Sequence, residues 1–319
     1  TPTLPAGGFE QATFLEWRNS EFFGQQTCQD WHAPTTSVGG AKSRTRITGT
    51  SHEGDLLYVK PREPVGRHIF VGGNTLLPAI LRDHADELLV QATPEAFEAT
   101  IAATRFQLRE QTANIEIEDL HREGDTLHIE ISIENLSGHK FPSGHSSRRA
   151  WLRVRVLDKE GRVVFISGDV DAKGRLVSPL GVLATELAGG PVAGHLAIIT
   201  SPDQVQVYEA ILADADRQRA AASHAATGFL KDNRLLPKGW KADHPDAAAT
   251  KPVGVGEDPD FKAGGDRVVY RVNVPESLRH YRIEAELLYQ PVSARHADEL
   301  FKVDAPEVKR FRGYFEAAD

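Results

Sequence analysis

The sequence of 319 residues contains a single cysteine, Cys28, and no methionine. One cysteine excludes a disulfide bond within the chain, so its redox compartment cannot be inferred from cystine pairs. Without methionine no thioether is available as a ligand, and any soft-metal or haem site must therefore use histidine or cysteine. A lack of methionine is expected near oxidants, which convert it to the sulfoxide, although drift in composition explains it equally well.

Clustered positive charge and long apolar runs are absent as well. The net charge is -8 at pH 7, and Lys and Arg are spread along the chain, which excludes the electrostatic footprint of a protein that binds nucleic acid or an anionic membrane. No apolar run approaches the roughly 18 to 20 residues of a membrane span, and the sequence opens at Thr1 without a basic, apolar leader. We therefore expect no membrane span and an export signal that has already been removed.

The chain does have the apolar content of a globular protein, because 40% of its residues are hydrophobic and its length suits two ordinary domains. Residues 1 to about 75 are rich in Gly, Pro and Thr and follow no regular apolar period. Between Thr75 and Gln111 apolar residues recur near helical spacing, and Thr93 followed by Pro94 is a helix start. This pattern predicts helices at about 76–90 and 94–111.

From residue 113 the apolar period changes to two, which is typical of strands with one buried face. Alternating residues at 115–117 and 127–133 are joined by the turn Glu123-Gly124-Asp125, so a hairpin is expected there. Further strands are expected at 151–156, 163–166, 195–200, 205–212, 268–274 and 282–288.

These elements predict a mainly β fold, in which a loop-rich N-terminal segment with two helices (1–112) packs on an antiparallel β-sandwich (113–319). An insertion at about 213–265 is expected to hold a short Ala-rich helix. It ends in an acidic loop, Glu257 to Asp260, followed by Asp266. These carboxylates could bind calcium, but without EF-hand spacing a solvated turn is favoured.

A short motif near the N-terminus carries chemistry. Cys28-Gln29-Asp30-Trp31-His32 is a C-x-x-C-H haem attachment motif in which Trp31 replaces the second cysteine. In the intact motif two thioethers hold the porphyrin edge while the adjacent histidine ligates iron, so the loss of one cysteine weakens attachment without abolishing it. On these residues alone, a buried Cys28 beside a packed Trp31 is the alternative interpretation.

Several stretches, in order along the chain, resemble the periplasmic multihaem c-type cytochromes related to cytochromes c-552 and c-554. The most specific is Gly138-His139-Lys140-Phe141-Pro142-Ser143-Gly144, followed by Arg148-Arg149-Ala150-Trp151-Leu152. The others are Glu16-Trp17 with Ser20, His68 to Asn74, Gln204 to Glu209, Leu230 to Lys238, Asp260-Phe261 with Gly264-Gly265-Asp266, and Leu288-Tyr289-Gln290. Arg148 and Arg149 are expected to pair with a carboxylate, that of the protein itself being favoured over a haem propionate.

The resemblance implies that His32, His68 and His139 correspond to haem ligands. A further histidine usually follows the serine that matches Ser20, and here Phe22 lies about where it would be. The chain therefore departs from the family twice at one haem, in an attachment thiol and in a distal ligand. The loss of both groups at one haem site indicates that the site no longer binds a cofactor or that it binds a different one.

Without haem, the three histidines of such a scaffold predict a metal site, and copper is the divalent ion that imidazole binds most strongly. The chain also resembles, more weakly, the surface copper-binding proteins of methane-oxidising bacteria, in which two histidines and an oxidised tryptophan hold copper. That tryptophan lies two residues before a histidine. Gly66 stands at this place before His68, and Trp31 beside His32 is the substitute. His145 is a candidate fourth ligand, or a group that orients one of the ligands by a hydrogen bond.

We therefore expect a periplasmic, secreted or cell-surface protein that binds copper through His68, His139 and His32. Two alternatives stay open: a haem c electron carrier attached through Cys28 and ligated by His32, with a redox partner such as a cytochrome, and a non-catalytic interaction module. No hydrolase, kinase or dehydrogenase motif is found, which favours a protein without catalytic activity. Of the other histidines, His121 and His128 beside the hairpin turn are expected to be solvated.

Overall fold

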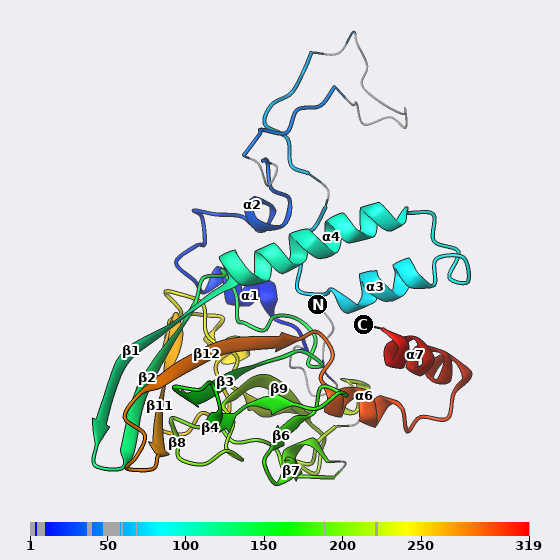
Figure 1. The fold of residues 1–319 in the computed structure, drawn as a ribbon. Coiled ribbons are helices and arrows are strands. Elements are labelled where there is room, and N and C mark those ends of the chain that lie inside the picture. The colour runs from blue at the N-terminus through cyan, green and yellow to red at the C-terminus, as the bar shows by residue number, and fades with distance from the viewer. Residues whose placement is uncertain are drawn as a thin grey trace. The chain divides into compact units, whose positions relative to one another are not determined.

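The computed structural model describes residues 4, 10–36, 40–46, 58, 60–67, 69–187, 189–220 and 223–318. The described chain is mainly β, as predicted, and divides into two compact units (Figure 1). The larger unit combines the residues up to Glu21 with Glu110–Ala317, and the smaller unit is Phe22–Arg109. No helix in the described ranges has both the length and the apolar content to cross a bilayer.

The first sheet of the larger unit has four strands. In order of pairing they are β1 (Ala113–Glu123), β2 (Thr126–Asn135), β11 (Gly265–Asn273) and β8 (Ile198–Ile199). All pairs are antiparallel except β11 with β8. Leu127, Ile129, Ile131 and Ile133 of β2 are buried, whereas the residues between them lie on the outer face. The predicted period of two is confirmed, and so is the hairpin.

The second sheet has β10 (Gly228–Asp232), β9 (Val207–Ala213), β3 (Arg149–Asp158) and β12 (Tyr281–Gln290), and β4 (Val163–Ser167) also pairs with β3. Phe165 on β4 contacts Tyr270 on β11 edge to face, at 6.4 Å between ring centroids, which joins the apolar faces of the two sheets. The arrangement is that of a β-sandwich. A small third sheet is formed by β5 (Asp169–Val170), β6 (Leu176–Ser178) and β7 (Gly181–Val182).

Charged side chains are buried beside this core. Lys140 Nζ lies 2.7 Å from Asp232 Oδ2, and Arg234 contacts both Asp232 and Glu16 of helix α1 (Thr13–Arg18). Two cations and two anions neutralise one another, as buried charges require. Burial alone would raise the pKa of Asp232, but Arg234 and Lys140 lower it well below its usual range.

Two kinds of element in the larger unit were not predicted. The short strands β5, β6, β7 and β10 are one kind, and the helices of the larger unit are the other: α1, α5 (Ala247–Thr250), α6 (Ala294–Leu300) and α7 (Pro306–Ala317). Of the Ala-rich helix expected before Lys231 in the insertion, the described residues form only a short 3-10 turn, Ser223–Ala225.

The smaller unit contains helices α2 (Cys28–His32), α3 (Leu76–Asp83) and α4 (Pro94–Gln107). The two predicted helices are confirmed, although α3 ends seven residues and α4 four residues before the predicted limits. The side chain of Thr93 accepts a hydrogen bond from Ala96 N at 3.3 Å, which confirms it as the N-cap. A π-helical turn, Leu108–Thr112, follows α4.

Candidate functional site

Helix α2 presents the degenerate haem motif. Thr27 caps it, because the Asp30 carboxylate accepts hydrogen bonds from Thr27 N (2.6 Å) and Thr27 Oγ1 (2.9 Å). These bonds, the backbone one first, hold the pKa of Asp30 below its usual range. Cys28 and His32 are four residues apart in this helix and therefore share a face. The thiol of Cys28 is exposed, so the alternative of a buried apolar cysteine is wrong.

Trp31, which stands in place of the second cysteine, packs against Phe22. The ring centroids are 5.1 Å apart and the planes meet at 83°. Both side chains are half-buried. The two positions at which the chain departs from the multihaem pattern are therefore in contact with each other.

The tautomer of His32 is fixed by a backbone carbonyl. Its Nδ1 lies 2.5 Å from Val71 O. Since a carbonyl oxygen only accepts, Nδ1 carries the hydrogen and the lone pair is on Nε2. This is the arrangement in which a histidine binds a metal through Nε2 while its other nitrogen is held by a hydrogen bond.

His139, in the larger unit, has the same tautomer. Its Nδ1 donates to Lys140 O at 2.9 Å, which leaves the lone pair on Nε2. The backbone of His139 is held firmly, because its carbonyl accepts hydrogen bonds from Asn135 Nδ2 (2.8 Å) and Ser137 Oγ (3.0 Å). Asn135 is buried at the end of β2, so the ring of His139 is carried by an ordered part of the sandwich.

His68 lies outside the described residues. His32 belongs to the smaller unit and His139 to the larger one, and each unit is described by itself. The centre of three histidines therefore stays a prediction.

His145 has the opposite arrangement. Its Nδ1 accepts a hydrogen bond from Ser147 N at 3.1 Å, and its Nε2 lies 3.4 Å from Glu10 Oε1. Its ring also meets that of His296 edge to face, 5.5 Å between centroids. Both histidines line a cavity of about 300 Å³ bordered by apolar residues and by the Arg219–Glu299 ion pair.

A buried polar cluster was missed by the sequence reasoning. His195 Nε2 lies 3.0 Å from Asp258 Oδ2 and 3.8 Å from Asp266 Oδ2, and the three side chains are 2%, 4% and 0% exposed. The solvated turn expected for these two carboxylates is therefore wrong. The one hint in the sequence was Gln206, a polar residue between Val205 and Val207 in a predicted strand, which proves to be buried beside His195.

These three residues have the donor types of a metal site, but their hydrogen bonds do not suit one. Gln206 Nε2 and Asn233 Nδ2 both donate to His195 Nδ1, at 2.7 and 3.1 Å. Neither amide can be flipped, because its oxygen also accepts a hydrogen bond. Gln206 Oε1 accepts from Leu196 N, and Asn233 Oδ1 accepts from Glu209 N.

The proton of His195 is therefore on Nε2, where a metal would have to bind. Burial lowers the pKa of His195 although Asp258 raises it. A neutral imidazole that donates to Asp258 and accepts from two amides satisfies all these groups without an ion. The cluster fits a structural role, and calcium gains no support from it, since a nitrogen donor is foreign to calcium sites.

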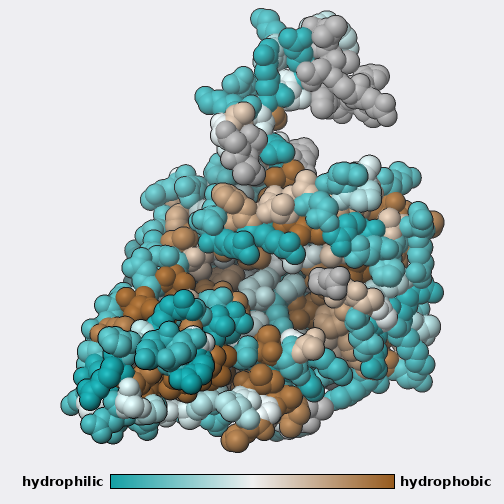
Figure 2. Space-filling view, in the orientation of Figure 1, coloured by the Kyte–Doolittle hydropathy of each residue, from teal (hydrophilic) through white to brown (hydrophobic). Residues whose placement is uncertain are grey.

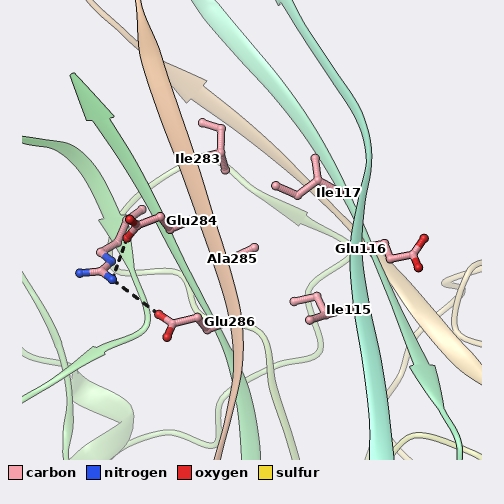
Figure 3. Close-up of a pocket in the computed structure, with 8 residues that line it drawn as sticks. Ile115, Glu116, Ile117, Ile283, Glu284, Ala285 and Glu286 are labelled. Carbon is pink, nitrogen blue, oxygen red and sulfur yellow. Dashed lines mark ion pairs between the residues drawn. The ribbon is translucent and has the colours of Figure 1, made fainter. Parts of the chain in front are cut away.

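An open cavity of about 560 Å³ lies between the edge strands β1 and β12. Figure 3 shows Ile115, Ile117 and Ile283 at its walls. Arg155, which also lines it, pairs with Glu284 and Glu286. The fourth charged group of the lining, Glu116, accepts a hydrogen bond from Asn114 Nδ2 at 2.9 Å. These groups form no arrangement of a nucleophile beside a base.

Comparison with known proteins gives little. No protein-family model matches the chain, and no curated protein matches it. Among solved structures, a penta-heme cytochrome c552 from Thermochromatium tepidum is similar, with a TM-score of 0.49 and 13% sequence identity. The similarity covers 96% of this chain and 50% of that one, so the chain spans about half the length of the cytochrome.

Proposed function

We propose that this chain is a metal-binding protein whose imidazoles hold copper through Nε2, with His32 and His139 as ligands and His68 as a third. The observation that carries the proposal is the shared tautomer of His32 and His139, each of which donates Nδ1–H to a backbone carbonyl. This hydrogen bond orients the ring and places the lone pair on Nε2. Of the other described histidines, His195 and His145 have Nδ1 as an acceptor.

Copper is the first choice because of the ligands that the sequence offers. Thioether ligands are absent and one thiol is present, so imidazole dominates, and copper heads the affinity order for divalent ions at nitrogen ligands. The contact of Trp31 with Phe22 supports a changed cofactor, because an aromatic pair occupies the two positions that an attached haem would use. On this proposal the protein is exported to the periplasm or secreted, and it acts beside a redox partner such as a cytochrome.

Haem c is the second candidate, and one observation favours it. The exposed thiol of Cys28 lies on the same face of α2 as His32. One thioether would form by addition of the thiol across a haem vinyl group, with sulfur bonded to one vinyl carbon and the hydrogen to the other. His32 would then supply Nε2 to the iron.

The test uses the purified full chain, exposed to copper or co-expressed with the enzymes of haem c attachment. Copper is measured by equilibrium dialysis and elemental analysis, and haem by a Soret band and a mass increase. We expect His32→Ala and His139→Ala each to lower bound copper, with His224→Ala, an exposed histidine of the turn Ser223–Ala225, as the matched control.

Unchanged copper in both variants would falsify the site. A Soret band with covalently bound haem would replace copper by the second candidate. If the wild type binds neither copper nor haem, the remaining alternative is a non-catalytic interaction module.

A further inference from the structure

The β1–β2 hairpin carries two histidines directly opposite each other. His121 pairs in register with His128, and their rings stack at 4.8 Å between centroids with only 3° between planes. His128 lies between the buried residues Leu127 and Ile129 of β2, so the pair is on the outer face of the sheet. The side chain of His121 is 56% exposed and that of His128 23% exposed.

A β-bulge puts His121 on this face. The register shifts between Ile117 and Asp119, so that Ile117 pairs with the buried Ile131 while Asp119 pairs with the outer Glu130. Without the extra residue, strict alternation from Ile117 would turn His121 towards the core. Bulges re-aim side chains in this way, often beside functional sites.

A carboxylate holds the His121 ring in the state that a metal ligand needs. Asp119 Oδ2 lies 2.6 Å from His121 Nδ1. An ionised carboxylate only accepts, so Nδ1 carries the hydrogen and Nε2 has the lone pair, as in carboxylate–histidine–metal arrangements. On the other side of the pair, Glu123 Oε2 lies 3.8 Å from His128 Nε2.

We propose that His121 and His128, with Glu123 as a third ligand, form a surface site for a divalent transition-metal ion, copper being bound most strongly. Two imidazoles and a carboxylate are a donor set that zinc and copper accept. A metal must lie in the plane of each ring that binds it, so the ring of His128 turns about its Cβ–Cγ bond while Asp119 holds the ring of His121 in place. This torsion of histidine has a broad energy well, and both rings border solvent.

The surrounding charges favour a cation. Asp119, Glu123 and Glu130 lie on the same face of the hairpin, against Arg271, which pairs in register with His128 on the neighbouring strand β11. Glu130 is engaged by Arg267 at 3.1 Å, so Asp119 and Glu123 are the carboxylates closest to the imidazoles. The end of the hairpin is mostly hydrophilic in Figure 2, and the side chain of His121 is exposed.

The site does not depend on His32, His68 or His139, so its test can distinguish it from the copper site of the proposed function. The full chain is titrated with Cu²⁺, and bound copper is counted by dialysis while electron paramagnetic resonance reports the coordinated nitrogens. We expect His121→Ala and His128→Ala each to remove one equivalent with two nitrogen ligands, and His224→Ala to remove none. A protein with both His32→Ala and His139→Ala should keep this equivalent.

A charge-matched pair of variants tests the built geometry. Asp119→Asn removes the carboxylate that fixes the ring of His121 and should weaken copper about 10-fold to 100-fold. Glu118→Gln removes the same charge from the bulge, where Glu118 pairs with Arg267 and not with a histidine, and should leave affinity nearly unchanged. Equal weakening by the two variants, or full copper in His121→Ala and His128→Ala with an unchanged circular dichroism spectrum, would overturn the site.

Discussion

Trp31 meets Phe22 edge to face, 5.1 Å between ring centroids, in the smaller unit of the chain. Each residue replaces one that the multihaem resemblance leads one to expect near a haem, a cysteine at position 31 and a histidine near position 22. An aromatic pair of this geometry contributes about 0.5 to 1.5 kcal/mol beyond its buried area. Trp31 and Phe22 thus stabilise each other's placement.

Trp31→Cys should allow haem attachment at a modest cost in stability, since the contact with Phe22 is lost. The variant has two cysteines in C-x-x-C-H spacing on α2, beside a His32 whose Nε2 carries the lone pair. Co-expressed with the haem c attachment enzymes, it should gain one covalent haem, measured by the pyridine haemochrome spectrum and by mass. Trp31→Cys combined with Cys28→Ala is the control and should attach much less. No gain of haem over the wild type would show that the α2 region cannot accept the porphyrin.

Asn135→Ala should loosen His139 and destabilise the larger unit. The Asn135 amide donates to the carbonyls of His139, Leu235 and Leu236, and its oxygen accepts from Ser137 N. Each buried carbonyl that loses its partner costs about 1 to 3 kcal/mol, so the free energy of unfolding in urea should fall by at least about 2 kcal/mol. On the proposed function, copper affinity should fall as well.

Ser137→Ala is the companion variant. It removes one hydroxyl from the same network and should cost about 1 kcal/mol. A smaller loss of stability in Asn135→Ala than in Ser137→Ala would mean that the amide is not what holds the loop.

The strands were predicted well where apolar residues at alternate positions bury one face of the strand. In β2, four apolar residues at alternate positions lie in the core, and the pattern alone indicates this. The segment 195–200 was expected as a full strand, but only Ile198–Ile199 pairs. Leu196 N donates to the side chain of Gln206 and Thr200 N to that of Gln204, so two amide side chains take the place of a neighbouring strand.

The candidate site could be predicted only in part. His32 and His139 were identified from motifs, but their tautomers depend on the carbonyls of Val71 and Lys140, and no spacing encodes that. The cluster of His195, Asp258 and Asp266 brings together residues up to 71 positions apart, which depends on tertiary packing. The pairing of His121 with His128 is local, but the bulge that turns His121 outward has no signature in the apolar pattern.

Arg149 and Glu186 form a buried ion pair, with both side chains 2% exposed and Nη1 2.6 Å from Oε1. This confirms the expected pairing with a carboxylate of the protein for Arg149, whereas Arg148 Nη1 donates to the carbonyl of Ser143. Glu186→Gln would leave the guanidinium charge buried beside a neutral amide, so we expect a loss of about 3 to 5 kcal/mol in the free energy of unfolding. Glu160→Gln breaks the exposed pair with Arg162 and should cost less than about 1 kcal/mol. Similar losses in the two variants would contradict the role given to burial.

Asp266 should make the larger unit less stable as pH rises towards neutrality. Burial raises the pKa of Asp266 from its ordinary value of 3.8 to about 7, while the Tyr208 hydroxyl, which donates to it at 2.7 Å, acts the other way. Because the folded pKa is the higher one, the stability from the protonated carboxyl is complete below about pH 4 and is lost as pH rises through about 7. The total loss is roughly 4 kcal/mol, at about 1.4 kcal/mol per pKa unit.

Asp266→Asn is neutral at every pH and should remove this slope. In urea unfolding from pH 4 to 8, the free energy of unfolding of the variant should rise relative to that of the wild type as pH rises. The difference should become constant above about pH 7. Tyr208→Phe should extend the decline of the wild type to higher pH, because the hydroxyl that lowers the pKa of Asp266 is gone. If the difference between Asp266→Asn and the wild type does not change with pH, the carboxyl is ionised throughout. A cation bound to His195, Asp258 and Asp266 would then have to be considered in spite of the hydrogen bonds to His195 Nδ1, and metal analysis of the same samples would detect it.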